Sequence, residues 1–551
     1  MRSAWAPLGM GALLAAIVAP LALGARAAPA PPEPTEAIRR EPRAILFSPD
    51  GDTAYVTEAA SGTVAVVAAT QRQVVARLET GGEEPTGLAL SPDGRTLAVT
   101  NTFSGSVAVF DTAARQRVRL VPLRGMPWGI AIAPDGRTAY VAVSQLDRVV
   151  RLDLATGAVT ASVAVGRRPR AVALAPGGET LVVGNFASGE VSLIEVATLR
   201  ERARVPMGGV NLRGLALTRD GSEAFVTLQP PLNGRPTSYP LDVWNNFVRA
   251  CSVSDGTVLR QEQQWLDFLA VGCADLDGIV LNGAGRWAWI AVGGRDSVAR
   301  ISIHDPLRVP PNGPVWPNHF AEARVGANPR GIALRPGERE VWVACALADE
   351  IAIVDAERMQ PLATLRLGAH RSDPALAGRR LFHSAALTSG GRFSCNSCHP
   401  EGGSDGLTWR FVHVEDAIER RNTRDLRGGI AETAPFRWSG HDARLDDFLR
   451  DEITGLLRGP APDAEQLAAL RAALATFRLP PNPHRQEDGS LTPAARRGEA
   501  LFVGKAQCAT CHAGPRRGGN GRQAWIGTTP AGVLLDVPHL TGVYDSPPYL
   551  H

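Results

Sequence analysis

The feature that most restricts how this chain can fold is a repeat that runs from residue 42 to residue 357. Each unit has a Pro-x-Gly or Pro-x-Ala start, or Leu-x-Gly in the units at 212 and 276, followed by an apolar run, a turn and an alternating apolar strand. The turn is clearest at Ser48–Gly51, Ser91–Gly94 and Ala133–Gly136, where proline presets φ and glycine takes a positive φ. The units begin at residues 42, 85, 127, 169, 212, 276 and 329.

A period of about 42 residues, with strand and turn signals and no helical pattern, is typical of one four-stranded propeller blade. Seven units therefore predict an all-β seven-bladed propeller, because closure of the ring removes free sheet edges. An open β-solenoid is the alternative. Longer spacings predict insertions at Gln229–Ala274 and Pro306–His319. In the first insertion, Cys251 and Cys273 either form a disulfide or remain buried thiols.

Two short motifs near the C-terminus carry the chemistry: Cys395-Asn-Ser-Cys398-His399 and Cys508-Ala-Thr-Cys511-His512. Each is C-x-x-C-H, the attachment motif for c-type haem. The two thiols join the porphyrin edge, and the histidine supplies an axial nitrogen to the iron. We call these the first and second haem sites, with His399 and His512 as metal ligands. A zinc site or a redox dithiol is the alternative interpretation.

The chain is therefore expected to be multidomain, with the propeller followed by a mostly α-helical di-haem cytochrome c region. The predicted haem domains are residues 376–480 and 490–551. Helical patterns occur at Leu445–Leu457 and Ala464–Phe477. The proline-rich stretch Leu479–Arg485 cannot continue a helix and predicts a linker between the two domains.

Several motifs resemble known families. The repeat resembles the YVTN family of bacterial β-propellers through Gly87–Gly94 and Tyr55–Thr57. The C-terminal region resembles the bacterial di-haem cytochrome c peroxidases and the related methylamine-utilisation di-haem maturases. The residues that carry this second resemblance are Leu381-Phe382, Arg421-Asn422-Thr423, Phe436–Gly440, Arg497–Phe502, Val537–Gly542 and Ser546–His551.

The resemblance to the peroxidases implies that hydrogen peroxide reacts at the first haem and that the second haem relays electrons. His413 falls where the removable distal histidine of the family lies, with His441 and His383 as competitors. Trp438 matches the tryptophan between the two haems. Glu452 is a candidate for the catalytic acid–base group.

The resemblance also implies a calcium ion between the haem domains, at the positions of Asn422, Ser546 and Pro548. The sixth ligand of the second haem, Met or Tyr in the family, lies after a Pro-Tyr-x-His stretch, and this sequence ends within that stretch. The candidates for that ligand are Tyr544, Tyr549, His539 and His551.

These motifs predict an oxidoreductase that reduces hydrogen peroxide with electrons from a small redox protein, while the propeller docks a partner. A non-enzymatic two-haem electron carrier is one alternative. A maturase that oxidises side chains of a partner protein is another, and the sequence does not separate it from the peroxidase.

The N-terminus predicts export to the periplasm. Residues 1–28 combine Arg2, the apolar run Leu8–Leu23 and a small-x-small site at Ala25–Ala27, as in a signal peptide. An uncleaved anchor is the alternative. No later stretch is apolar enough to span a bilayer. The net charge of +3 gives no case for nucleic acid as a partner.

Overall fold

The computed structural model describes residues 39–229, 246–266, 272–303, 320–368, 373–410, 420–486, 488–519, 521–525 and 534–547. The predicted signal peptide and the predicted insertion at Pro306–His319 lie outside these ranges, as do His413, Pro548, Tyr549 and His551.

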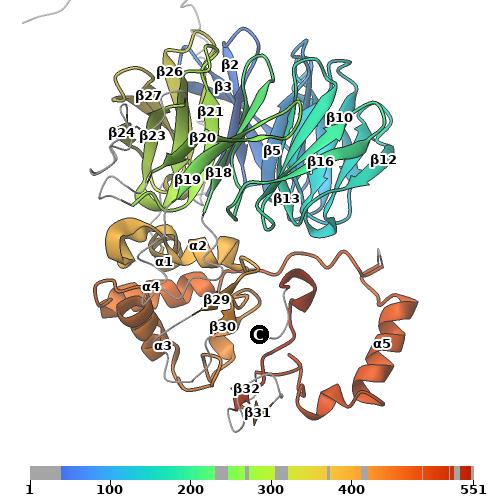
Figure 1. The fold of residues 1–551 in the computed structure, drawn as a ribbon, viewed down its shortest axis with the longest axis vertical. Coiled ribbons are helices and arrows are strands. Elements are labelled where there is room, and N and C mark those ends of the chain that lie inside the picture. Colours follow the sequence, from blue (N-terminus) through green and yellow to red (C-terminus); the bar gives the residue numbers. More distant parts are fainter. Residues whose placement is uncertain are drawn as a thin grey trace, which may run out of the picture. The chain divides into compact units, whose positions relative to one another are not determined.

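Seven sheets of four consecutive antiparallel strands form the propeller (Figure 1). The strands of blades one to four are β1 (Pro42–Phe47), β2 (Thr53–Glu58), β3 (Thr63–Ala68), β4 (Gln73–Glu79), β5 (Pro85–Leu90), β6 (Thr96–Asn101), β7 (Ser106–Asp111), β8 (Gln116–Pro122), β9 (Pro127–Ile132), β10 (Thr138–Val143), β11 (Arg148–Asp153), β12 (Val159–Ala164), β13 (Pro169–Leu174), β14 (Thr180–Asn185), β15 (Glu190–Glu195) and β16 (Arg200–Pro206). Blades five to seven comprise β17 (Leu215–Leu217), β18 (Glu223–Leu228), β19 (Phe247–Ser252), β20 (Val258–Trp265), β21 (Leu276–Leu281), β22 (Trp287–Val292), β23 (Ser297–Ser302), β24 (Ala321–Arg324), β25 (Pro329–Leu334), β26 (Glu340–Cys345), β27 (Glu350–Asp355) and β28 (Pro361–Arg366).

Neighbouring blades are held together by apolar side chains that alternate along each strand. In β6, Leu97 and Val99 pack toward blade one, and Ala98 packs toward blade three. Burial of one such Val or Leu side chain contributes roughly 1.5–3 kcal/mol. The innermost strand of blade seven, β25, lies beside β1, which closes the ring. The predicted seven-bladed propeller is confirmed, and the open solenoid is excluded.

Two sequence-based boundaries in the propeller are wrong. The outer strand of blade seven, β28, lies beyond residue 357, so the propeller extends to Arg366. Within the predicted insertion Gln229–Ala274, β19 and β20 are regular strands of blade five.

The possible disulfide between Cys251 and Cys273 does not form, because both residues are buried free thiols in different hydrophobic clusters. Burial raises the pKa of the Cys251 thiol to about 12. Cys345 is also a buried free thiol, in the core of blade seven.

The haem region contains short helices joined by irregular segments. Its helices are α1 (Pro374–His383), α2 (Cys395–Cys398), α3 (Leu445–Asp451), α4 (Ala464–Leu474) and α5 (Pro493–Val503), and its short strands are β29 (Thr408–Arg410), β30 (Arg420–Asn422), β31 (Gln523–Ala524) and β32 (Leu535–Asp536). In α1, Asp373 caps the first turn through Leu376 N at 2.8 Å. The helix then packs against α4 so closely that a Cβ at Gly378 would meet the carbonyl of Ala469.

The two predicted helical patterns of this region are present. Leu445–Leu457 corresponds to α3 and a following π-helical turn, Glu452–Leu456, and Ala464–Phe477 corresponds to α4. In the described ranges no helix has the length and apolar character needed to cross a bilayer.

Candidate haem sites and their junction with the propeller

The first haem site is one helical turn that presents both thiols and the histidine. A capping box of Ser394 and Ser397 starts α2, with Ser394 N donating to Ser397 Oγ at 2.9 Å. His399 N donates to Cys395 O at 2.9 Å and closes the turn. Apolar residues surround Cys398, including Phe393 of the same segment. This surrounding fits the hydrophobic edge of a porphyrin.

Both motif histidines hydrogen-bond to backbone carbonyls through Nδ1 and could hold iron through Nε2. His399 Nδ1 lies 2.9 Å from Arg424 O, and His512 Nδ1 lies 3.1 Å from Arg517 O and 3.2 Å from Pro538 O. A carbonyl oxygen only accepts, so each Nδ1 carries the proton and each Nε2 keeps the lone pair that binds iron. Burial lowers the pKa of His399, which keeps the ring neutral for ligation. The residues present therefore fit haem iron at both sites.

A buried propeller carboxylate holds the helix of the first haem site. Asp275, 1% exposed, accepts hydrogen bonds from Ser394 Oγ (2.5 Å), Ser397 Oγ (2.7 Å) and Asn396 Nδ2 (3.1 Å). Asn211, in the neighbouring blade, donates from Nδ2 to Ser397 O at 2.8 Å. We call Asp275, Ser394, Asn396 and Ser397 the Asp275 cluster.

Glu401, two residues after His399, lies among propeller arginines. Glu401 Oε1 lies 3.1 Å from Arg330 Nη2, and Glu401 Oε2 lies 3.3 Å from Arg43 Nη1. Burial alone would raise the pKa of Glu401, but Arg330 and Arg43 hold it well below its usual range. Both arginines occupy the second position of their repeat unit, as Arg170 and Arg213 do in blades four and five.

All seven blades contact the haem region through this junction. The contacts, in blade order, are Glu41 with Arg379, Glu83 with Arg478, Gln145 with Asp545, Arg168 with Asp545, Asn211 with Ser397, Asp275 with Ser394, and Arg330 with Glu401. This face of the propeller is therefore covered by the haem region of the same chain.

A continuous series of contacts links the two haem sites. The Arg424 carbonyl binds His399, and the Arg424 guanidinium lies 5.4 Å from the centre of the Trp438 ring. The same guanidinium lies 3.6 Å from Asp536 Oδ2, and Asp536 N donates to Trp438 O at 2.8 Å. Two residues later, the Pro538 carbonyl accepts from His512. Trp438 thus contacts both Arg424, whose carbonyl binds His399, and Asp536, which lies two residues before the Pro538 carbonyl that binds His512.

The second haem site is much more exposed than the first. Its motif begins in a 3-10 turn, Cys508–Thr510, and neither this turn nor α5 contains a buried residue. Leu501 and Val503 of α5 are 54% and 58% exposed, and the Phe502 ring centre lies 6.4 Å from that of His512. Apolar side chains beside the two thiols fit the attachment of a large hydrophobic group.

The other predicted catalytic residues lie in different surroundings. Glu452 begins the π-helical turn Glu452–Leu456 and accepts a hydrogen bond from Arg437 Nη1 at 3.3 Å. Burial raises the pKa of Glu452 although Arg437 opposes the shift. His441 is exposed. His383 lies at the junction, with Nδ1 3.5 Å from Arg330 Nη2.

The calcium and sixth-ligand candidates are only partly described. Asn422 Oδ1 accepts from Thr408 Oγ1 at 2.7 Å, and Ser546 Oγ lies 3.5 Å from Gly542 O. The Tyr544 hydroxyl donates to the carbonyl of Pro480. His539 is partly buried, and its Nδ1 has no hydrogen-bond partner in the described structure. Within the same ranges, no group of three or more His, Cys, Asp or Glu side chains could hold a metal ion.

Sequence reasoning missed Asp275, Glu401 and Asp405. Asp405 is fully buried, its N–H donates to Cys398 O at 3.0 Å, and its Oδ2 accepts from Trp409 Nε1 at 3.1 Å. Burial raises the pKa of Asp405 to about 7, so it is a further acid–base candidate beside the first haem site. One sequence feature could have pointed to Asp275 as a contact residue. It directly precedes a repeat unit, as the junction residues Glu41 and Arg168 do.

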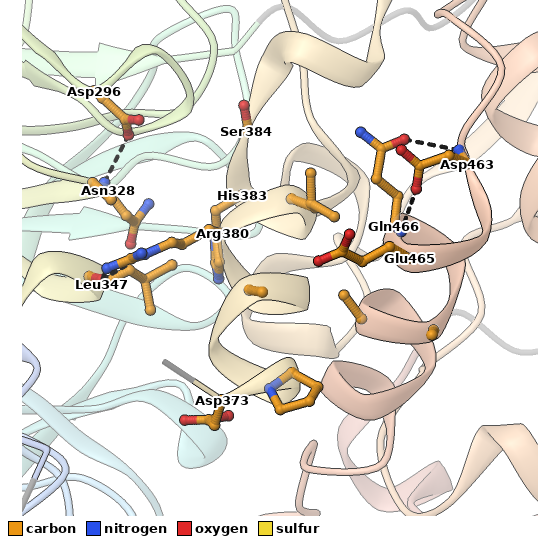
Figure 2. Close-up of a pocket in the computed structure, with 16 residues that line it drawn as sticks. Asp296, Asn328, Leu347, Asp373, Arg380, His383, Ser384, Asp463, Glu465 and Gln466 are labelled. Carbon is orange, nitrogen blue, oxygen red and sulfur yellow. Dashed lines mark hydrogen bonds between the residues drawn. The ribbon is translucent and has the colours of Figure 1, made fainter. Parts of the chain in front are cut away.

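One cavity has no residue of the haem motifs in its lining. Its volume is about 550 Å³, and it lies between α1, α4 and the loops of blades six and seven (Figure 2). Several of its polar groups have partners: Asp463 caps α4 through Gln466, and Arg380 donates to Leu347 O, whereas the buried Asn328 Nδ2 has none in the described structure. His383 lines this cavity, which places it on the junction side of α1.

Comparisons with known proteins agree with both halves of the chain. The family model "Lactonase, 7-bladed beta-propeller" matches residues 39–126. A solved structure of Kuenenia stuttgartiensis hydrazine synthase aligns with a TM-score of 0.53 at 24% identity, over 60% of this chain and 99% of that chain. At this identity the likeness concerns the fold alone, and it agrees with the propeller described above.

Two curated relatives match in sequence. Hydrazine synthase subunit gamma of Kuenenia stuttgartiensis is 31% identical over 26% of this chain and 44% of its own length. Methylamine utilization protein MauG of Methylorubrum extorquens is 31% identical over 24% of this chain and 48% of its own length. The chain thus spans about half the length of the curated relatives it matches. The predicted resemblance to a propeller and to methylamine-utilisation maturases is confirmed, and at a coarse level the chain is similar to redox proteins of the haem type.

Proposed function

We propose that this chain is a periplasmic di-haem c-type oxidoreductase that reduces hydrogen peroxide. The balance is one H₂O₂, two electrons and two protons to two waters, with the electrons supplied by a small redox-protein donor. The observation that carries the proposal is the series of contacts from His399 through Arg424, Trp438 and Asp536 to His512.

Haem supplies the chemistry that stores electrons and reacts with peroxide. The chain's residues orient that chemistry. Backbone carbonyls fix the rings of His399 and His512, and Trp438 provides an aromatic group between them. The second site is more exposed than the first. This difference supports electron entry at the second site, because a donor protein can reach an exposed site.

Protons for the reaction would come from residues beside the first site. Asp405, whose pKa is raised to about 7 by burial, can hold and release a proton near neutral pH. Glu452 is the second candidate, and His413 would be the removable distal ligand. A calcium ion near Asn422, Ser546 and Pro548 would tie the haem domains together.

The junction limits how the propeller can dock a partner. Contacts from all seven blades cover one face with the chain's own haem region. A partner protein would therefore bind another surface of the propeller or the exposed second haem site.

A maturase that oxidises a partner protein is the second candidate, favoured by the sequence match to MauG. The two functions differ in the source of electrons: the peroxidase takes them from a reduced donor, and the maturase takes them from side chains of its substrate. The non-enzymatic electron carrier predicts no reaction of the reduced protein with peroxide.

The test uses holoprotein with its haems attached, in the half-reduced state, before and after hydrogen peroxide. We expect stoichiometric peroxide consumption, and a high-spin ferric electron paramagnetic resonance signal that is lost in His399→Ala and kept in His512→Ala. The opposite pattern would exchange the roles of the two sites. No consumption by the half-reduced or fully reduced protein would support the electron carrier instead.

A further inference from the structure

We infer that Asp275 of the propeller is a positioning residue of the first haem site, and that its charge lowers the reduction potential of the haem attached there. This inference rests on the proposed function only in requiring a haem on Cys395 and Cys398. On this inference, the propeller supplies a residue of the redox site and does not serve as a scaffold alone.

The positioning part follows from the Asp275 cluster. Asp275 accepts hydrogen bonds from the residue before the first cysteine, Ser394, and from both residues between the two cysteines, Asn396 and Ser397. Side chains of Asn396 and Ser397 are fully buried. Hydrogen bonds to an ionised group are roughly twice as strong as neutral ones. The carboxylate therefore fixes the turn that presents the thiols, and through it the position of His399.

The electrostatic part follows from burial and proximity. Asp275 is 1% exposed, so solvent screens its charge weakly. Its carboxylate accepts a hydrogen bond from Asn396 and one from Ser397, the two residues between the cysteines, so the charge lies next to the turn that would carry the porphyrin edge. A negative charge near the porphyrin edge stabilises the more positive, ferric state of the iron. Second-shell groups of this kind tune haem potentials.

A nearby arginine moderates this charge. Arg213 is 3% exposed, and its Nη1 lies 3.7 Å from Asp275 Oδ1. The Arg213 Nη2 also approaches the carbonyl of Asn396, at 3.5 Å. Removal of Arg213 should therefore shift the potential in the direction opposite to removal of the Asp275 charge.

Asp275 is specific to one blade. The residue before each repeat unit is Glu41, Glu84, Met126, Arg168, Asn211, Asp275 and Asn328, in blade order. Of these, Asp275 is the carboxylate that contacts the residues around the cysteines, whereas Glu41 binds Arg379. The propeller thus uses one repeat position for several junction contacts, and one of them lies at the haem.

The experiment is a spectroelectrochemical titration of the full-length holoprotein, with the two haems distinguished by His399→Ala and His512→Ala reference spectra. In Asp275→Asn, which keeps the side-chain shape, we expect the potential of the first haem to rise. A shift of about 59 mV, a tenfold change in the ferric-to-ferrous ratio of a one-electron couple, is the expected scale. The potential of the second haem should not move.

Two variants serve as controls. Asp349→Asn removes a buried carboxylate from the same face, one that accepts from Arg40 N and Glu41 N, and should leave both potentials unchanged. Arg213→Gln should lower the first potential. This opposite shift keeps the inference testable if Asp275→Asn yields no folded protein.

The outcomes are distinct. An unshifted first potential in Asp275→Asn with both haems attached, or a rise in Arg213→Gln, would overturn the inference. An equal shift of both haems would also overturn it, because a general loss of structure would act on both. If the unsubstituted protein gives no pyridine haemochromogen absorbance, it carries no haem. That result would instead contradict the proposed function.

Discussion

The two haem sites share one motif but differ in how the rest of the chain supports them. At the first site, the residues between the cysteines are fully buried, and a propeller carboxylate holds them. At the second site, the preceding helix α5 has no buried residue, and Leu501 and Val503 are more than half exposed. The first site is thus built into a rigid fold, and the second depends on the group that it binds.

This difference fits a division of labour. A site that would react with peroxide needs fixed geometry, which the Asp275 cluster supports at the first site. A site that receives electrons from another protein needs accessibility, which the second site has. Covalent attachment of a haem at the second site would compensate for the weak packing there, because thioethers would hold the cofactor without a preformed pocket.

The largest expected effect concerns the second site. In Cys508→Ala/Cys511→Ala, α5 should lose nearly all protection from amide hydrogen exchange, since an 11-residue helix without packing is marginal in water. The matched variant Cys395→Ala/Cys398→Ala should leave α1 and α4 protected, because their packing does not use the haem. Equal loss of protection in both variants would remove the distinction between the sites.

The junction offers the next largest effect. Glu401→Gln leaves the buried guanidinium of Arg330 with less compensating charge and should cost about 3 kcal/mol of unfolding free energy. Urea unfolding at neutral pH measures this change. The control Arg137→Gln breaks an exposed pair with Asp153 and should change stability much less, because solvent screens that pair. Similar values for both variants would show that the junction contributes little.

The junction should also make stability depend on acid pH. Burial opposes ionisation of Glu41, but Arg379 lowers the pKa of Glu41 from 4.5 to about 2. A depressed folded-state pKa contributes stability that is complete above the unfolded value and lost as pH falls through the folded value. The contribution is about 3 kcal/mol above pH 4.5, and it disappears toward pH 2. Unfolding of the native protein and of Glu41→Gln from pH 6 to pH 2 should converge over that window, and parallel curves would contradict this assignment.

The propeller could be predicted from the sequence because each blade repeats the same local signals. Pro-Asp-Gly turns mark where strands begin, and Gly51 and Gly94 have the positive φ that such turns require. The errors occurred where those signals are missing. Strand β28 follows no such turn. Strand β19 lies after an unusually long spacing, so the sequence predicts an insertion where Cys251 in fact belongs to a strand.

The haem ligands could also be predicted, because attachment chemistry demands a fixed local spacing of two cysteines and a histidine. The junction could not. Ser394 and Asp275 are separated by 119 residues, and nothing local marks them as partners. The pKa of Asp405 depends on burial, which a Gly-Ser-Asp-Gly stretch does not indicate. Site chemistry that depends on long-range packing therefore required the structure.

The smallest expected change in stability concerns the residue between the two sites. Trp438→Phe keeps an aromatic ring near Arg424 and weakens that contact by about 0.5–1 kcal/mol. Haem content and both potentials should stay unchanged, whereas electron transfer from the second site to the first should slow. Flash reduction of the exposed site, followed by absorbance of each haem, measures this transfer. Trp525→Phe, a change at a tryptophan that is 55% exposed, is the control and should leave the rate unaltered. Equal rates in the two variants would mean that electrons pass between the sites without Trp438. Electron transfer from the exposed second site to the first site would then need another route.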